Sequence, residues 1–172
     1  MNSIYIHIPF CRKACHYCDF HFSTSLRFKD DFLLALKKEI VLQKRYFSDS
    51  LNSGNDQVIH SVYFGGGTPS ILSGDELMDI FASLNSHFPI AADAEITLEA
   101  NPDDLTVAKL HELIATPVNR LSIGVQSFHD DDLRWMNRIY SAERAERSVT
   151  DAQAMGFSNI TALYIGAALA FS

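Results

Sequence analysis

Short apolar stretches alternate with longer amphipathic stretches along this chain of 172 residues. The first apolar stretch, Ser3 to Ile8, is β-branched and aromatic and stops at Pro9, which is typical of a buried strand. From about Lys29 to Phe47, apolar side chains recur at helical spacing with charges on the other face. The same alternation predicts further strands at 59–64, 94–99, 120–125 and 159–165, and helices at 74–88, at 105–115 and, in segments, at 131–155.

The alternation of strands and helices predicts an α/β fold. Near-continuous apolar strands indicate parallel β/α units, wound right-handedly, with both faces of the sheet covered. An open sheet and a barrel both fit this pattern. Each of the first four strands is followed directly by a distinctive sequence: a cysteine loop, GGGTP, EANPDD and QSF. In β/α barrels this edge of the sheet carries the active site.

Composition and charge exclude several classes of protein. The 14 basic and 21 acidic residues give a net charge of −7, which argues against broad nucleic-acid binding through phosphates. The N-terminus, MNSIYIHIPF, lacks the charged leader and long apolar run of a secretory signal. No stretch approaches the roughly 20 apolar residues of a membrane span. We therefore expect a cytoplasmic protein without a membrane span.

Three cysteines lie close together in the loop after the first strand, at Cys11, Cys15 and Cys18. In a reducing compartment an odd cluster of thiols is a poor disulfide framework and a better metal site. Thiolates suit iron–sulfur clusters and zinc. Three thiolates on a cubane of four irons leave one iron open to another ligand. The alternative is structural zinc, with a fourth ligand from His7, His16 or His21.

The segments after the later strands offer polar groups to a ligand. The three glycines of GGGTPS at 65–70 let the backbone approach a ligand closely, and no Lys-Ser/Thr follows at the spacing of a phosphate-binding P-loop. Glu99 at a strand end can accept hydrogen bonds, Gln126 can donate and accept, and Arg138 offers a planar fork to a carboxylate. Taken singly, these features also fit a sharp turn and ordinary surface residues.

Taken in order, the segments YIHIPFCRKACHYCDF, VYFGGGTPS, TLEANPDD, RLSIGVQSF and MNRIYSAERA carry a family resemblance. They are similar to the radical S-adenosylmethionine (SAM) family of oxygen-independent coproporphyrinogen III oxidases and HemW heme chaperones. The similarity runs from Ile4 to about Thr161. It implies a 4Fe-4S cluster on Cys11, Cys15 and Cys18, whose open iron binds SAM, and reduction of that SAM to a 5′-deoxyadenosyl radical.

The resemblance also implies a fold, further site residues and partners. The fold is an incomplete (β/α) barrel of the radical SAM type, with about four to five parallel units. Expected partners are heme or coproporphyrinogen III, an electron donor such as flavodoxin or ferredoxin, and an unidentified heme acceptor. The expected SAM contacts are Gly66, Gly67 and Thr68 at the methionine end, then Glu99, Gln126 and Arg138, with Tyr5 and Tyr17 as aromatic neighbours of SAM and the cluster.

The sequence just after Cys18 separates the two branches of the family. The oxidases resemble C-x-C there, whereas this chain continues with Asp19 and Phe20, the form associated with HemW. We therefore expect a heme chaperone, which binds heme and passes it on. The oxidase, which decarboxylates coproporphyrinogen III to protoporphyrinogen IX, is the second expectation. A zinc-stabilised, non-enzymatic binding module is the third.

The chain departs from the family pattern near its end. The segment TALYIGAALAFS lacks the Asp that helps hold SAM in the family, and Tyr140 stands where a histidine is expected. The His-Asn-x-x-Tyr-Trp motif tied to heme is also missing. We expect residues 1–172 to be the N-terminal part of a radical SAM barrel domain, with later barrel strands and a C-terminal domain absent. The apolar tail then leaves a strand edge exposed.

Overall fold

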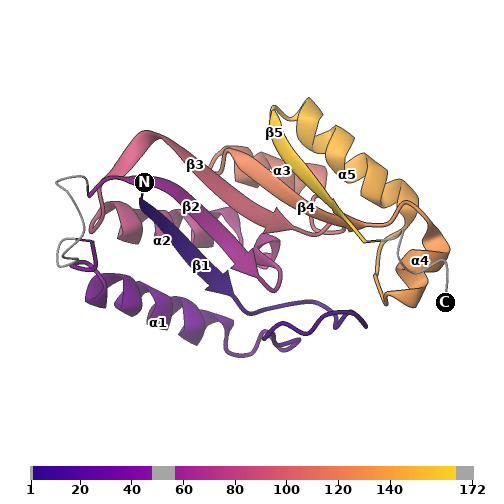
Figure 1. Cartoon of the computed structure of the whole chain (residues 1–172), viewed down its shortest axis with the longest axis horizontal. Coiled ribbons are helices and arrows are strands. Elements are labelled where there is room, and N and C mark those ends of the chain that lie inside the picture. Colours follow the sequence, from indigo (N-terminus) through magenta and orange to yellow (C-terminus); the bar gives the residue numbers. More distant parts are fainter. Residues whose placement is uncertain (1, 48–56, 166–172) are drawn as a thin grey trace.

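The computed structural model describes residues 2–47 and 57–165, which form one five-stranded parallel sheet with its connecting helices (Figure 1). The predicted strands and helices are confirmed. Their observed bounds are β1 (Asn2–Ile8), α1 (Lys29–Leu42), β2 (Ile59–Gly66), α2 (Gly74–Asn85), β3 (Ile90–Ala100), α3 (Val107–Ile114), β4 (Arg120–Gln126), α4 (Asp130–Trp135), α5 (Ala142–Ala154) and β5 (Asn159–Tyr164), with a 3-10 turn at Pro69–Ile71.

The strands lie in the sheet in the order in which they occur in the sequence, β1-β2-β3-β4-β5. When successive crossovers are right-handed and the strand order never reverses, every helix falls on the same face of the sheet. The expectation that helices cover both faces is therefore wrong. In Figure 1, α2 and α3 lie behind the sheet, while α1 and α5 lie beside its two outer strands. This singly wound arrangement is that of a β/α barrel rather than a doubly wound sheet.

One continuous apolar core fills the space between the sheet and its helices. Alternate strand residues point into it, as the two-residue period of a strand requires. On the opposite face, Tyr5 of β1 is 59% exposed. The strand residues of the core include Ile6, Ile8, Val62, Phe64, Ile96, Leu98, Leu121 and Ile123, and its helical residues include Leu77, Ile80, Leu84, Leu110, Leu113, Ala145 and Ala152.

Two helices end earlier than their apolar periodicity predicts. Helix α1 stops at Leu42 instead of residue 47, and α2 stops at Asn85 instead of residue 88. The rings of Phe47 and Phe88 nevertheless pack edge to face with centroids 5.9 Å apart. These aromatic side chains cover the core from the turns after the two helices, so their spacing imitates a longer helix.

Side-chain caps mark the N-terminal ends of α2, α3 and α5. Ser73 caps α2 in a reciprocal box with Glu76, while Thr106 and Ser141 accept from the backbones of α3 and α5. Ser73 and Thr106 end the segments that follow β2 and β3, and Ser141 ends the loop between α4 and α5. In the described part of the chain, no helix has the length and apolar character needed to cross a membrane.

Candidate functional site

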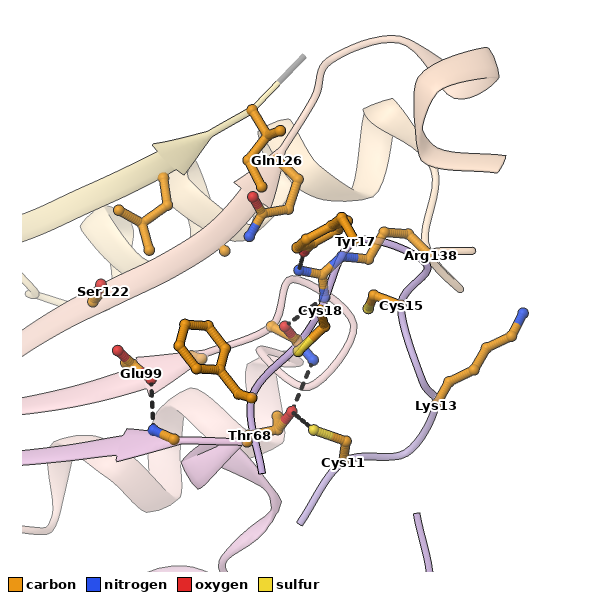
Figure 2. Close-up of a pocket in the computed structure, with 18 of the residues that line it drawn as sticks. Cys11, Lys13, Cys15, Tyr17, Cys18, Thr68, Glu99, Ser122, Gln126 and Arg138 are labelled. Carbon is orange, nitrogen blue, oxygen red and sulfur yellow. Dashed lines mark hydrogen bonds between the residues drawn. The ribbon is translucent and has the colours of Figure 1, made fainter. Parts of the chain in front are cut away.

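A pocket of about 350 Å³ lies at the carboxyl edge of the sheet (Figure 2). The segments after β1, β2, β3 and β4 all contribute to it, as expected when parallel strands end at one edge. It brings together all the predicted site residues except Tyr5. These are Cys11, Cys15, Tyr17, Cys18, Gly66, Gly67, Thr68, Glu99, Gln126 and Arg138.

The cysteine loop is closed at its base and anchored at its tip. The backbone amide of Cys11 donates to the Ser23 carbonyl at 3.0 Å, and the Ser23 amide donates to the Pro9 carbonyl at 2.7 Å. At the tip, Asn137 Nδ2 donates to the Ala14 carbonyl at 2.7 Å. Asn137 itself has a φ of 62°, in the left-handed region that asparagine tolerates best among non-glycine residues. The three thiols are therefore presented by a loop with fixed ends.

An ion pair between Arg12 and a buried carboxylate ties the same loop to the segment after β3. Arg12 Nε lies 2.7 Å from Asp104 Oδ1, and the Asp104 side chain is only 1% exposed. The other carboxylate oxygen accepts from Ser70 Oγ at 2.7 Å. Because a buried carboxylate needs such partners to stay charged, Asp104 fixes three loops relative to one another.

The glycines of GGGTP are required by close contacts with β1 and the cysteine loop. Gly66 has a φ of +111°, and a Cβ there would lie 2.6 Å from the His7 ring. A Cβ on Gly67 would lie 2.6 Å from the Phe10 carbonyl oxygen and 3.0 Å from Cys11 Sγ. The Thr68 amide donates to the Phe10 carbonyl at 2.7 Å. Only glycine lets this segment lie directly beside the cysteine loop.

Glu99 connects β3 to the glycine segment. Its Oε2 accepts from the Gly66 amide at 3.1 Å and its Oε1 accepts from the Tyr63 hydroxyl at 2.7 Å. The carboxylate lines the pocket with these two bonds in place, and each oxygen keeps accepting capacity for a ligand hydroxyl or ammonium group.

Arg138 lines the pocket and connects several of its segments by hydrogen bonds. Its Nη2 donates to the Tyr17 hydroxyl, and its Nη1 donates to Asn101 Oδ1 at 3.0 Å. Asn101 Nδ2 in turn donates to Thr68 Oγ1 at 3.2 Å, and Thr68 Oγ1 donates to Cys11 Sγ at 3.5 Å. A chain of hydrogen bonds therefore runs from the guanidinium to a thiol, and Figure 2 shows its last step, between Thr68 and Cys11.

The surroundings of Cys11 and Cys15 favour the protonated thiols in the absence of a metal. Burial raises the pKa of Cys11, although the hydrogen bond from Thr68 opposes this. Burial likewise raises the pKa of Cys15, with Arg138 opposing, and raises the pKa of Tyr17 to about 12. A bound metal must displace these protons, so loading of the site releases protons to solvent.

Two buried polar atoms in the pocket have no hydrogen-bond partner among the described residues. They are Gln126 Oε1, an acceptor, and Arg138 Nε, a donor. Gln126 is 7% exposed and has a φ of 65°, a strained conformation for a residue other than glycine. Unpaired buried groups and local strain gather where a ligand completes the structure. The pocket is thus suited to a ligand that carries both a donor and an acceptor.

Tyr5 lies outside the pocket lining. Its hydroxyl pairs with His7 Nδ1 at 3.2 Å and its ring stacks on Tyr63 with centroids 6.0 Å apart. A Cβ on Gly65 would lie 2.9 Å from the Tyr5 ring, so Tyr5 shapes the glycine segment from the side. Sequence reasoning missed Asn101, which also lines the pocket. Its position two residues after Glu99, in the same segment after a strand, is the signal that could have found it.

Tyr140, which replaces the expected histidine, is buried beneath Arg138. The guanidinium carbon lies 5.6 Å from the centroid of the Tyr140 ring. The Tyr140 hydroxyl donates to the Gly124 carbonyl at 2.6 Å. Burial raises its pKa, so the hydroxyl stays protonated as a donor. Tyr140 therefore supports both Arg138 and the end of β4.

The geometry does not favour a zinc site. His7, His16 and His21 all lie outside the pocket lining, and His16 Nδ1 pairs with the Trp135 carbonyl oxygen at 2.7 Å. Among the described residues, no three His, Cys, Asp or Glu side chains are placed to hold a metal ion. A cubane asks for a different arrangement, because each thiolate binds a different iron. Three half-buried thiols around one pocket fit that chemistry better.

A singly wound parallel sheet with three thiols and a glycine-rich segment at its carboxyl edge defines a β/α-barrel-type cofactor-binding protein. The family model described as Radical SAM superfamily matches residues 5–167. The chain therefore belongs to the Radical SAM superfamily, which implies SAM and a 4Fe-4S cluster as its cofactors.

The relatives point to heme and porphyrin proteins within this superfamily. The chain is 37% identical over 163 residues to the heme chaperone HemW of Bacillus subtilis (strain 168). The matched segment covers 94% of this chain and 41% of that protein. The chain is 36% identical over 157 residues to the HemW of Escherichia coli (strain K12), covering 90% and 39%. The chain thus spans about two fifths of the length of these curated relatives.

A solved structure supports the same fold. The coproporphyrinogen III oxidase HemN from Escherichia coli, described as a radical SAM enzyme, matches with a TM-score of 0.82 and 32% identity. The match covers 94% of this chain and 36% of that chain. It confirms the expected fold class, a partial barrel of the radical SAM type.

Proposed function

We propose that this chain is the radical SAM part of a HemW-like heme chaperone, which binds heme and passes it to an acceptor. Cys11, Cys15 and Cys18 hold the cluster in this proposal. The observation that carries it is the pocket itself, where these thiols share one wall with the unpaired buried atoms of Gln126 and Arg138. The match to HemW proteins over most of this chain supports the heme part.

The pocket residues suit different chemical groups of SAM. The Arg138 guanidinium, with a free buried donor at Nε, suits the carboxylate of the methionine moiety. Gly66, Gly67 and Thr68 let that moiety approach the cysteine loop. Glu99 and the unpaired Oε1 of Gln126 accept from hydroxyl or ammonium groups. When bound, the cluster supplies the single electron that cleaves SAM.

The proposal includes partners and a setting that the family suggests. The electron donor is a small redox protein such as flavodoxin or ferredoxin, and the heme acceptor is unidentified. A cytoplasmic, reducing compartment suits three unpaired thiols. Residues 1–172 correspond to the N-terminal part of a radical SAM barrel domain, in keeping with a sheet whose outer strands β1 and β5 each pair with one neighbour.

Anaerobic reconstitution with iron and sulfide tests the cluster. The protein should become brown, with broad absorbance near about 400 nm and about four irons per chain. Cys15→Ala should lose this absorbance. Lys13→Ala is the matched control, because Lys13 lines the same pocket without a hydrogen bond or ion pair in the described structure. A colourless product with one zinc per chain would contradict the proposal.

Coproporphyrinogen III oxidation is the second candidate, because the matched structure is an oxidase. Titration of the full-length protein with heme, followed by absorbance, should show tight uptake with no porphyrin turnover if it is a chaperone. The parallel anaerobic assay supplies SAM, a reductant and coproporphyrinogen III. Protoporphyrinogen formed in that assay would transfer the assignment to the oxidase.

A further inference from the structure

The hydrogen bonds between Arg138 and Cys11 have a fixed direction. An arginine side chain has donors and no acceptor, so the atom of Asn101 that faces Arg138 must be Oδ1. The amide nitrogen of Asn101 then faces Thr68 and donates to its oxygen. Arg138 thereby decides which way the Asn101 side chain points.

This orientation decides where the Thr68 proton goes. A hydroxyl has one hydrogen, and an oxygen that accepts from Asn101 directs that hydrogen elsewhere. Thr68 is 3% exposed, so water does not compete, and Cys11 Sγ at 3.5 Å is its acceptor in the described structure. The Cys11 sulfur therefore receives a hydrogen bond from Thr68, and Arg138 sets its direction through Asn101.

We propose that Asn101 is a positioning residue that directs the Thr68 proton onto Cys11 Sγ and so raises the reduction potential of the cluster. The inference rests on the proposed cluster function. A donor to a thiolate sulfur stabilises negative charge, and the reduced cluster carries one more negative charge than the oxidised one. Removing the donor makes reduction harder. Asn101 reaches the Cys11 sulfur through Thr68.

Asn101→Asp is the most direct variant, because it keeps the shape of the side chain and the contact with Arg138. A carboxylate cannot donate, so the Thr68 hydroxyl turns its proton away from the sulfur and toward the new oxygen. Thr68→Val removes the hydroxyl and keeps the side-chain shape. Both variants should shift the potential to more negative values, by about tenfold in the reduction equilibrium, or about 59 mV for one electron. Thr68→Ser keeps the hydroxyl and should therefore keep the reduction potential of the wild type.

The double variant separates proton direction from added charge. Potentials come from a redox titration of the reconstituted protein followed by electron paramagnetic resonance. In the Thr68→Val background, Asn101→Asp should lower the potential much less than it does in the wild type, because no proton remains to redirect. An equal shift in both backgrounds would overturn the inference, since the carboxylate charge alone would then explain it.

A measurement on the cluster-free protein keeps this inference separate from the proposed function. In the nuclear magnetic resonance spectrum, the Thr68 hydroxyl proton should show an Overhauser contact to the β-protons of Cys11, and Asn101→Asp should abolish it. Failure of the wild type to assemble a cluster would count against the proposed function alone. Absence of the Overhauser contact in the wild type would overturn the positioning role.

Discussion

Gly67 lies so close to Phe10 that a Cβ added to Gly67 would be 2.6 Å from the Phe10 carbonyl oxygen and 2.9 Å from the Phe10 nitrogen. These atoms belong to backbone, which cannot rotate away as a flexible side chain can. The glycine segment and the cysteine loop therefore pack tightly, backbone against backbone. The spacing of the thiols depends on this contact as much as on the loop itself.

Gly67→Ala should push the cysteine loop away from its place. We expect the iron bound after anaerobic reconstitution to fall several-fold, because Cys11 moves relative to the other two thiols. The measurement is iron per chain, with circular dichroism to establish that the fold is kept. Gly74→Ala is the control, since its Cβ would meet no atom closer than 3.3 Å and lies at the start of α2. Full iron content in Gly67→Ala would show that the packing of Gly67 against Phe10 does not position the thiols.

Arg138→Gln should weaken the binding of SAM. Charge-assisted hydrogen bonds contribute about 1.5–3 kcal/mol, so the dissociation constant should rise by a factor between about 10 and about 150. The measurement is equilibrium binding of SAM to reconstituted protein of matched iron content. Tyr17→Phe is the control for a purely structural effect, because it removes the hydrogen bond between Arg138 and Tyr17 while leaving the guanidinium in place. An unchanged affinity in Arg138→Gln would exclude a direct contact.

The fold was predictable from the sequence because the strands are unusually explicit. Apolar runs such as Ser3 to Ile8 alternate with amphipathic segments, and each of the first four strands is followed by a helix. Which faces of the sheet the helices cover was not predictable in the same way. Coverage on one side depends on strand order, which no local pattern records, and the apolar runs of a barrel resemble those of a doubly wound sheet.

The segments that form the site were predictable from the sequence, but the hydrogen bonds and ion pairs between them were not. Cysteine spacing and the ordered motifs placed ten residues in one pocket, because parallel strands end at a common edge. The roles of Asn101 and Asp104 depend on contacts between loops that are far apart in sequence. The family resemblance suggested Tyr5 as an aromatic neighbour of SAM and the cluster; its ring stacks on Tyr63, and its role toward SAM stays a prediction. Such contacts follow from packing rather than from motifs.

Phe64→Ala should destabilise the fold strongly. Phe64 is fully buried in the centre of β2 and packs on Phe81 with ring centroids 5.3 Å apart. Truncation of such a side chain costs about 3–5 kcal/mol in the free energy of unfolding, from lost burial and a residual cavity. Urea denaturation followed by circular dichroism measures this loss. Leu34→Ala, at a position 56% exposed on α1, should change stability little.

Asp103→Asn should stabilise the protein at neutral pH. Burial raises the pKa of Asp103, and the neighbouring Asp104 raises it further, while Oδ1 is buried without a partner. A carboxyl group with a raised pKa in the fold favours the protonated form, so its contribution to stability is present at low pH and lost as pH rises through that pKa.

The difference between Asp103→Asn and the wild type should therefore grow from pH 3 to pH 7. Urea unfolding at several pH values measures it. Asp93→Asn is the control, because this exposed carboxylate on β3 makes no hydrogen bond or ion pair in the described part of the chain, so loss of its charge should change stability little across the same range. A variant that is less stable than the wild type at pH 7 would show that the charge of Asp103 is needed.

Mössbauer spectroscopy of protein reconstituted with iron-57 is the most direct test of the cluster on Cys11, Cys15 and Cys18. Spectra are taken without oxygen, before and after SAM is added. We predict that one iron in four changes its signal on addition of SAM, because three irons are held by thiolates and the fourth is open. Spectra that show no 4Fe-4S cluster, or four irons that all ignore SAM, would contradict the account.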